Sequence, residues 1–125
     1  MVLYNKNIIL NILGSAFGDE LEMYVYNYIL QMKSEELEPY FGLEVDYALF
    51  DRFDRLIVEN YEVKSEGEHE DFISGALEAR SKIDAFVCSE EEPIYKGSMI
   101  LPVGLWYEFR VKDETYTDLY LEYLY

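Results

Sequence analysis

The last third of the chain alternates apolar and polar side chains over a length that only extended strands can use. Apolar residues occupy every odd position from 99 to 111, and a similar alternation returns over 115–125 after a polar turn. Successive side chains of a strand point to opposite faces, so a period of two predicts strands over 96–111 and 115–125, each with one buried face. Pro102 and Gly104 lie inside the first of them and predict a bulge or an edge position there.

Two earlier segments fit strands, but each also fits a helix. The segment 76–88 alternates in the same way, yet a helix covering 72–87 also gathers its apolar residues on one face. The length of the alternation favours the strand. Residues 55–64 fit a strand in which Glu59 falls on the apolar side, and we expect a polar loop over 65–71. Four strands joined in sequence predict an antiparallel meander.

The first 54 residues favour helices. Leu21, Val25 and Ile29 share one helical face after the glycine-containing breaker 14–18, which predicts a helix over 19–33. We expect Asp19 to cap this helix, with Glu22 completing a capping box.

The segments on either side of this helix are less regular. Residues 1–13 fit either a core-packed strand or a first helix. Pro39 and Gly42 suggest a short helical turn followed by a connection. The run 46–54 fits a short helix, because its apolar residues recur every three to four positions.

These elements predict an α+β fold, with N-terminal helices packed on a four-stranded antiparallel β-meander. No linker or internal repeat interrupts the 125 residues. We therefore expect a single domain over 1–125, mainly helical over 1–54 and mainly antiparallel sheet over 55–125. The apolar stretch at the start is broken by asparagines, unlike a signal peptide, and cytoplasmic residence is the simplest expectation.

The charge limits the partners that such a domain can have. The chain carries 26 acidic and 10 basic residues, a net charge of −16. A folded chain of this length is about 35 Å across, and a duplex of about 35 Å carries about 20 phosphate charges. Direct binding to nucleic acid or to an anionic membrane is therefore not expected. A basic protein surface is the natural partner, although a general solvated acidity explains the same composition.

The chain holds few groups for catalysis. His69 is the single histidine, so paired histidine metal sites are excluded, and its acidic neighbours lack the spacing of a calcium loop. Cys88 ends an apolar stretch, so we expect a buried, inert thiol. The run Glu90–Glu92 predicts a charged hairpin tip. We expect no enzyme activity, no metal and no cofactor.

Thirteen tyrosines mixed with carboxylates indicate an interaction surface instead. Tyr116, Asp118, Tyr120 and Glu122 alternate along the last predicted strand and should share its polar face. Glu62 could join them if the fold brings the acidic segments together. These five residues are the predicted partner-binding site. We expect charge reversal at Asp118 and Glu122 to abolish binding and to leave the fold unchanged or more stable.

Two functional hypotheses follow. In the first, the protein is a non-catalytic inhibitor that presents carboxylates and tyrosine rings, in place of phosphates and bases, to a basic nuclease or to a restriction or CRISPR effector. An immunity protein against a nuclease toxin fits the same description. In the second, the protein is a small binding or structural module for an apolar ligand or for a second copy of itself, so that a homodimer is possible.

Overall fold

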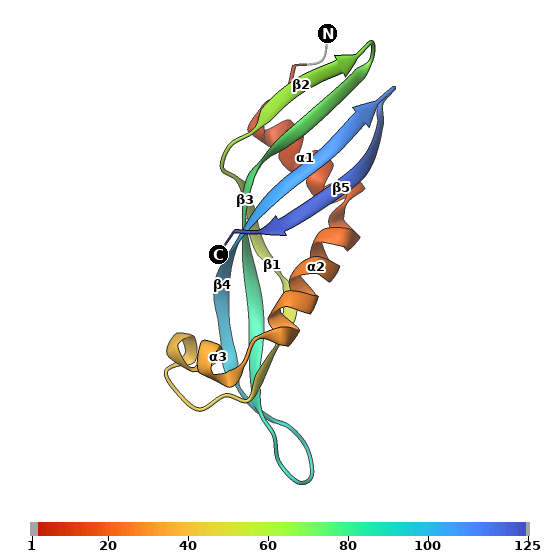
Figure 1. The fold of residues 1–125 in the computed structure, drawn as a ribbon. Coiled ribbons are helices and arrows are strands. Elements are labelled where there is room, and N and C mark those ends of the chain that lie inside the picture. Colours follow the sequence, from red (N-terminus) through yellow and green to blue (C-terminus); the bar gives the residue numbers. More distant parts are fainter. Residues whose placement is uncertain (1–2, 125) are drawn as a thin grey trace.

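The computed structural model describes residues 3–124 and contains three helices followed by an antiparallel sheet of five strands (Figure 1). The helices are α1 (Lys6–Ala16), α2 (Gly18–Gln31) and α3 (Ser34–Phe41). The strands are β1 (Tyr47–Val58), β2 (Glu62–Gly67), β3 (Glu70–Val87), β4 (Ile94–Lys112) and β5 (Thr115–Tyr123). The α+β class is confirmed, with five strands in place of the four expected. Among residues 3–124, no helix combines the length and apolar character needed to cross a membrane.

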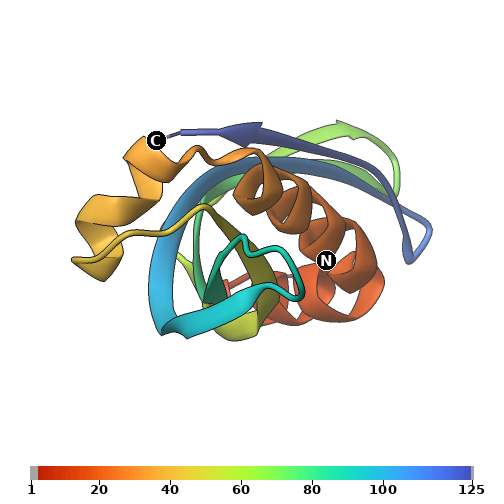
Figure 2. The same ribbon diagram turned by 90° about the horizontal axis from the view of Figure 1, so that it is seen from below.

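The strand order is β1-β3-β4-β5, and β2 pairs with the first part of β3. β1 and β2 therefore lie one after the other along the same edge of β3, and the predicted strand 55–64 covers the end of one and the start of the other. β3 and β4 are long and strongly twisted, and they cross in the view of Figure 1. Seen from below, the sheet curves around α1 and α2 (Figure 2).

One core cluster joins the helices to the concave face of the sheet, which we call the inner face. Fully buried helix residues include Leu13, Leu21 and Ile29, and the buried sheet residues include Ile83 and Phe109. Side chains alternate along each strand, so those between the buried positions point to the opposite, outer face. The alternation of β4 thus fills the inner face, as its sequence predicts.

Asn60, in the segment between β1 and β2, packs closely against Gly75 of β3. The backbone carbonyl oxygen of Asn60 accepts a hydrogen bond from the buried Tyr107 hydroxyl at 2.8 Å. The side-chain Oδ1 of Asn60 accepts a hydrogen bond from the Ala76 amide at 2.9 Å. A Cβ atom on Gly75 would lie 2.2 Å from this Asn60 carbonyl oxygen. The glycine is needed here for close approach of the backbone.

The helix predicted over 19–33 is confirmed as α2, which ends two residues earlier. Its predicted cap is wrong: the N-cap is Phe17, which offers no side-chain hydrogen bond, and Asp19 lies in the first turn. Phe17 is buried and its ring centroid lies 5.5 Å from that of Phe109. Packing of Phe17 against the sheet, rather than a capping carboxylate, therefore fixes where α2 begins. The predicted breaker 14–18 is reduced to this one residue, because α1 continues to Ala16.

Of the other N-terminal predictions, two are confirmed and one is wrong. α1 confirms the helical alternative for the first segment. The Asn5 side chain caps this helix by accepting a hydrogen bond from the Ile8 amide at 2.8 Å. Residues 1–2 of the predicted segment lie outside the described part. α3 supplies the short helical turn, which ends at Gly42 with a φ of 69°. The short helix predicted over 46–54 is wrong, because that segment belongs to β1.

Two irregularities explain the error in β1. Its pairing with β3 shifts between Phe50 and Arg52 and again between Phe53 and Arg55, so Asp51 and Asp54 are extra residues. Each bulge displaces the alternation by one position. As a result Phe50, Phe53 and Leu56 all pair with inner-face positions of β3 at a spacing of three, which resembles a helical period.

The remaining sheet predictions are close to the structure. β3 confirms the strand interpretation of 76–88 and excludes the helix over 72–87. The predicted loop over 65–71 is wrong: β2 and β3 occupy most of it, and Glu68 and His69 form the turn. β5 pairs only with Leu105–Lys112 of β4, so Pro102 lies where β4 is a sheet edge, one of the two positions expected.

Candidate functional site

The five predicted binding residues do not all share one face, because β5 contains a bulge. Val111 pairs with Tyr116 and Arg110 with Thr117, but Glu108 pairs with Tyr120, so β5 carries one extra residue between these pairs. Asp118 has a φ of 58°, in the left-handed region. The bulge reverses the alternation, since a shift of one residue moves side chains to the other face. The single polar face predicted for β5 is therefore wrong at Tyr116.

Tyr116 lies on the inner side of the sheet. It pairs with Val111 and lines a small pocket of about 210 Å³ together with Tyr4 and Ile12. The Tyr4 hydroxyl donates a hydrogen bond to Asp71 Oδ2 at 3.0 Å. Burial and this contact with Asp71 raise the pKa of Tyr4 to about 12. The pocket therefore joins the start of the chain to the sheet and is separate from the outer acidic residues.

Glu62, Tyr120 and Glu122 lie on the outer face. Glu62, Ser74, Glu108 and Tyr120 occupy four neighbouring strands in one cross-strand row. Glu62 and Tyr120 are three strand spacings apart, about 14 Å. In the next row Glu122 pairs with Trp106, whose Nε1 donates to Glu108 Oε1 at 3.0 Å. In these two rows of the described sheet, no carboxylate therefore lies directly opposite another across neighbouring strands.

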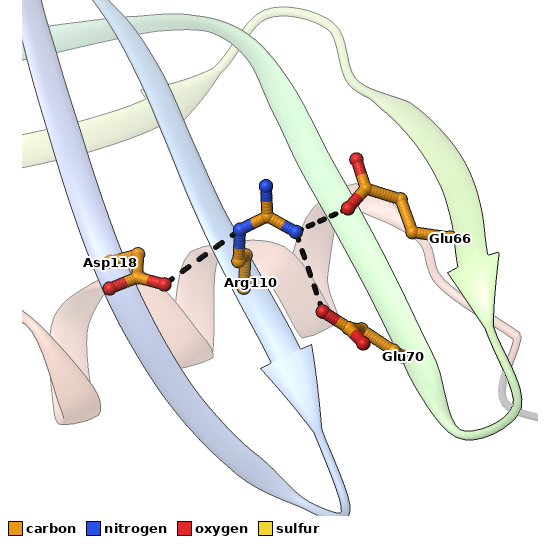
Figure 3. Close-up of polar contacts among 4 residues, drawn as sticks. All are labelled: Glu66, Glu70, Arg110 and Asp118. Atoms are coloured by element: carbon orange, nitrogen blue, oxygen red, sulfur yellow. Dashed lines mark hydrogen bonds and ion pairs between the residues drawn. The ribbon is translucent and has the colours of Figure 1, made fainter.

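Arg110 lies at the centre of this end of the outer face. Its guanidinium contacts Glu66 and lies 3.4 Å from Glu70 Oε1 and 3.7 Å from Asp118 Oδ2 (Figure 3). The hydrogen bond with Glu66, followed by the nearby negative charges, raises the pKa of Arg110. Its Cζ also lies 5.3 Å from the centroid of the Phe72 ring, within the range of a cation–π contact.

This arrangement changes the role expected of Asp118. Its carboxylate shares one cation with two glutamates, so part of the acidity of the outer face is neutralised internally. A lysine at position 118 would place two cations against each other. Charge reversal there should therefore weaken the fold, contrary to the sequence-based expectation. Asp118 and Glu122 retain a predicted role in partner binding.

A group of carboxylates without cation partners lies on the helical side. Residues 18–51, covering α2, α3 and the start of β1, carry nine acidic residues and one lysine, a net charge of −8 and half that of the whole chain. Of the nine, only Asp51 forms an ion pair among residues 3–124, with Lys82 at 3.3 Å. Glu36 accepts from the Lys33 amide and Asp46 from the Cys88 amide. The other six we call the helical carboxylates. They are Asp19, Glu20, Glu22, Glu35, Glu38 and Glu44.

Apolar side chains are exposed beside the helical carboxylates. Met23 of α2 is 61% exposed and Tyr26 is 38% exposed. Together with Phe50 of β1 they line a groove of about 590 Å³, whose other lining residues are Asp19, Glu22 and Asp51. The lining of the groove thus combines three apolar or aromatic side chains with three carboxylates. The sequence predicts Asp19 and Glu22 as capping residues of this helix, but it carries no signal for the groove, which α2 and β1 form together.

A tyrosine cluster lies where α2 meets β5. The rings of Tyr28 and Tyr123 stack with centroids 3.7 Å apart. Burial and a hydrogen bond with Tyr28 raise the pKa of Tyr123. These two tyrosines therefore pack α2 against the edge of the sheet, and only part of their surface is available to a partner.

The nucleophilic and metal-ligating residues do not converge. Cys88 is exposed, and the prediction of a buried thiol is wrong, because β3 ends at Val87 and the thiol follows in the loop. His69 occupies the β2–β3 turn with a φ of 62° and lies 3.8 Å from Glu68. Within residues 3–124, no group of three or more His, Cys, Asp and Glu side chains is arranged to hold a metal ion.

Sequence reasoning also missed four cations on the outer face. Arg55 pairs with Arg80, and Arg52 pairs with Lys82 in the next row. The signal in the sequence is the spacing of basic residues in 52–55 and 80–82, but the bulges of β1 hide their alignment. No family model, curated protein or solved structure matches the chain, so a functional assignment depends on this geometry.

Proposed function

We propose that the protein is a non-catalytic acidic inhibitor that binds the basic surface of a nucleic-acid-handling protein. The partner is a nuclease, a restriction or CRISPR effector, or a nuclease toxin that the protein neutralises. The observation that carries the proposal is the group of six helical carboxylates, which lack cation partners among residues 3–124. Cytoplasmic residence, without a cofactor or direct contact with nucleic acid or membrane, belongs to the same proposal.

The physical argument rests on what these carboxylates cost the free protein. Concentrated charge of one sign weakens a compact fold by self-repulsion. Where the chain neutralises its acids, as around Arg110, it does so with cations of its own. On α2 and α3 it leaves the repulsion in place. A basic groove that binds phosphates would be attracted to this surface, and its capture would be accelerated by electrostatic steering.

Two surfaces compete as the binding site. The helical carboxylates are the more negative, and the exposed Met23 and Tyr26 beside them add contact area. The outer face of β5 offers Glu122 and Tyr120, with Glu62 three strands away. We favour the helices, because the cations of the outer face offset part of its acidity. The site predicted from sequence stays in the test as the second surface.

The test is inhibition of DNA cleavage by a panel of purified basic nucleases and effectors. We expect at least one member to be inhibited, with an affinity that falls steeply between about 50 mM and about 500 mM salt, because the contacts are charge pairs. Inhibition that does not depend on salt, or no inhibition of any member, would contradict the proposal.

Matched variants then locate the surface. Glu20→Lys with Glu22→Lys should abolish inhibition, whereas Glu62→Lys with Glu122→Lys changes the net charge equally and should preserve it. The opposite pattern would assign binding to the β5 face. Equal weakening by both pairs would mean that overall charge, not a defined surface, drives the inhibition, and would contradict the proposal of a defined site.

The alternative function is a small binding or structural module. The groove between α2 and β1 favours it, since the exposed Met23 and Tyr26 line that groove. The apolar face of β4 is not available to a ligand, because it is buried in the core. Chemical shift changes confined to Met23 and Tyr26 on adding hydrophobic probes, unaffected by salt, would favour this alternative.

A further inference from the structure

The four cations on the outer face of β1 and β3 form two rows of like charge. Arg55 lies directly opposite Arg80, and Arg52 directly opposite Lys82. Like charges in directly opposed positions destabilise a pair of strands. These residues, which we call the cationic patch, account for four of the ten basic residues in a strongly acidic chain. Their clustering is costly to the isolated fold and calls for an anionic partner.

The chain neutralises the patch only in part. Glu78 lies 3.4 Å from Arg80, and Asp51 lies 3.3 Å from Lys82. Arg52 and Arg55 are exposed and have no ion-pair partner among residues 3–124. Two guanidinium groups thus remain available, and their planar donors suit carboxylates.

The complementary feature is the loop between β3 and β4. It projects beyond the helices at one end of the molecule (Figure 1) and carries three consecutive exposed carboxylates, Glu90–Glu92. The Ser89 hydroxyl contacts the Glu92 carbonyl oxygen and closes the loop. None of the three carboxylates has a cation partner among residues 3–124. We call these residues the glutamate tip.

The tip and the patch are separated along β3. β3 continues for five residues beyond Lys82 before the loop begins, about 17 Å at the rise of a strand. Between the two ends the outer face carries an aromatic row, in which Phe86 pairs with Tyr47 and Tyr95. Tyr95 is 56% exposed and Ile100, beside Lys82, is 39% exposed. The tip is too far away to neutralise the patch of its own chain.

We propose that two copies of the chain associate through this face around a two-fold axis, with the glutamate tip of each copy against the cationic patch of the other. A two-fold axis near the aromatic row places the three carboxylates of each tip against the patch of the other copy, where Arg52 and Arg55 have no ion-pair partner among residues 3–124. The contact is self-complementary and closes as a dimer. Tyr95 and Ile100 supply apolar contact between the charged ends. The inference goes beyond the proposed inhibition and does not depend on it.

Sedimentation equilibrium with charge-reversed variants tests the dimer. The patch variant carries Arg52→Glu, Arg55→Glu, Arg80→Glu and Lys82→Glu, and the tip variant carries Glu90→Lys, Glu91→Lys and Glu92→Lys. We expect each alone to weaken dimerisation at least tenfold. In an equimolar mixture the two variants should form a heterodimer, because the lysine tip meets a glutamate patch while the native tip meets the native patch.

Control variants separate this contact from a general effect of charge. Glu20→Lys, Glu22→Lys and Glu38→Lys change the charge as much as the tip variant does, and should leave the dimer unchanged. If the patch variant loses its circular dichroism signal, Arg52→Gln with Arg55→Gln replaces it, because these side chains are exposed on an edge strand. This milder variant should also weaken the dimer.

Three results would overturn the proposal. One is a wild-type protein that stays monomeric up to high micromolar concentration. The second is a dimer that survives both reversals, and the third is a mixture of variants that remains monomeric. If the monomeric protein instead binds a single-stranded oligonucleotide through Arg52 and Arg55, the patch serves nucleic acid and no dimer is built on it.

Discussion

Replacing Gly75 with alanine tests the junction between β1 and β2. The new Cβ would lie 2.2 Å from the Asn60 carbonyl oxygen and 2.7 Å from the Tyr107 hydroxyl, so the backbone at Asn60 must move. The φ of Gly75 lies outside the left-handed region, so the strain of the substitution is steric. Movement breaks the 2.8 Å hydrogen bond from Tyr107, whose side chain is fully buried.

The expected loss follows from two contributions. An unsatisfied buried hydroxyl costs about 1–3 kcal/mol, and forcing an extra methyl group into a packed site costs about 1–3 kcal/mol. We therefore expect Gly75→Ala to lower the free energy of unfolding by about 2–6 kcal/mol, a large part of the stability of a small domain. Urea denaturation followed by circular dichroism measures it.

Two control variants make the result specific. Gly14→Ala lies on the exposed side of α1 with no atom near the new Cβ, and should stabilise the protein by about 0.5–1 kcal/mol. Tyr107→Phe removes the hydroxyl alone and should cost about 1 kcal/mol. A loss below about 1 kcal/mol for Gly75→Ala would refute the argument, because it would mean that the junction relaxes without losing its hydrogen bond.

Three further predictions concern charge and strain. The melting temperature should be higher in about 0.5 M salt than at low salt, because screening relieves repulsion among the helical carboxylates; a calorimetric scan at each salt concentration tests this. Asp118→Gly should leave the free energy of unfolding in urea unchanged or raise it by up to about 1 kcal/mol, because release of the left-handed backbone strain outweighs the loss of an exposed ion pair. A clear loss of stability would show that the ion pair with Arg110 is the stronger effect. Burial and the contact with Asp71 raise the pKa of Tyr4 in the folded state from its ordinary value of 10.0 to about 12. The stability that this raised pKa contributes is present below pH 10 and should be lost as the pH rises to 12. The free energy of unfolding of Tyr4→Phe should therefore fall less than that of the wild type over this pH range.

The sequence predicts the helix–sheet order because two periods are regular over long segments. Leu21, Val25 and Ile29 mark α2, and the alternation of 99–111 marks β4, since burial repeats without interruption there. β2 gives no such signal. All six of its residues are exposed, so no period distinguishes them from a loop.

The failed predictions in β1 and at Tyr116 share one physical origin, the β-bulge. A bulge at Asp118 moves Tyr116 to the inner face, and bulges at Asp51 and Asp54 convert the alternation of β1 to a spacing of three. These shifts are set by pairing with a distant strand, which local periodicity does not contain. The alignment of Arg52 with Lys82 is invisible in the sequence for the same reason.

The bulges of β1 also bear on how the protein avoids aggregation. β1 is an edge strand, and an exposed edge presents amide and carbonyl groups that another chain can extend into a larger sheet. A strand added to β1 would have to match two displaced positions within four residues and approach the exposed Asp51 and Asp54 carboxylates. Removing either bulge would straighten the edge and favour fibrillar assembly, even where the folded monomer became more stable.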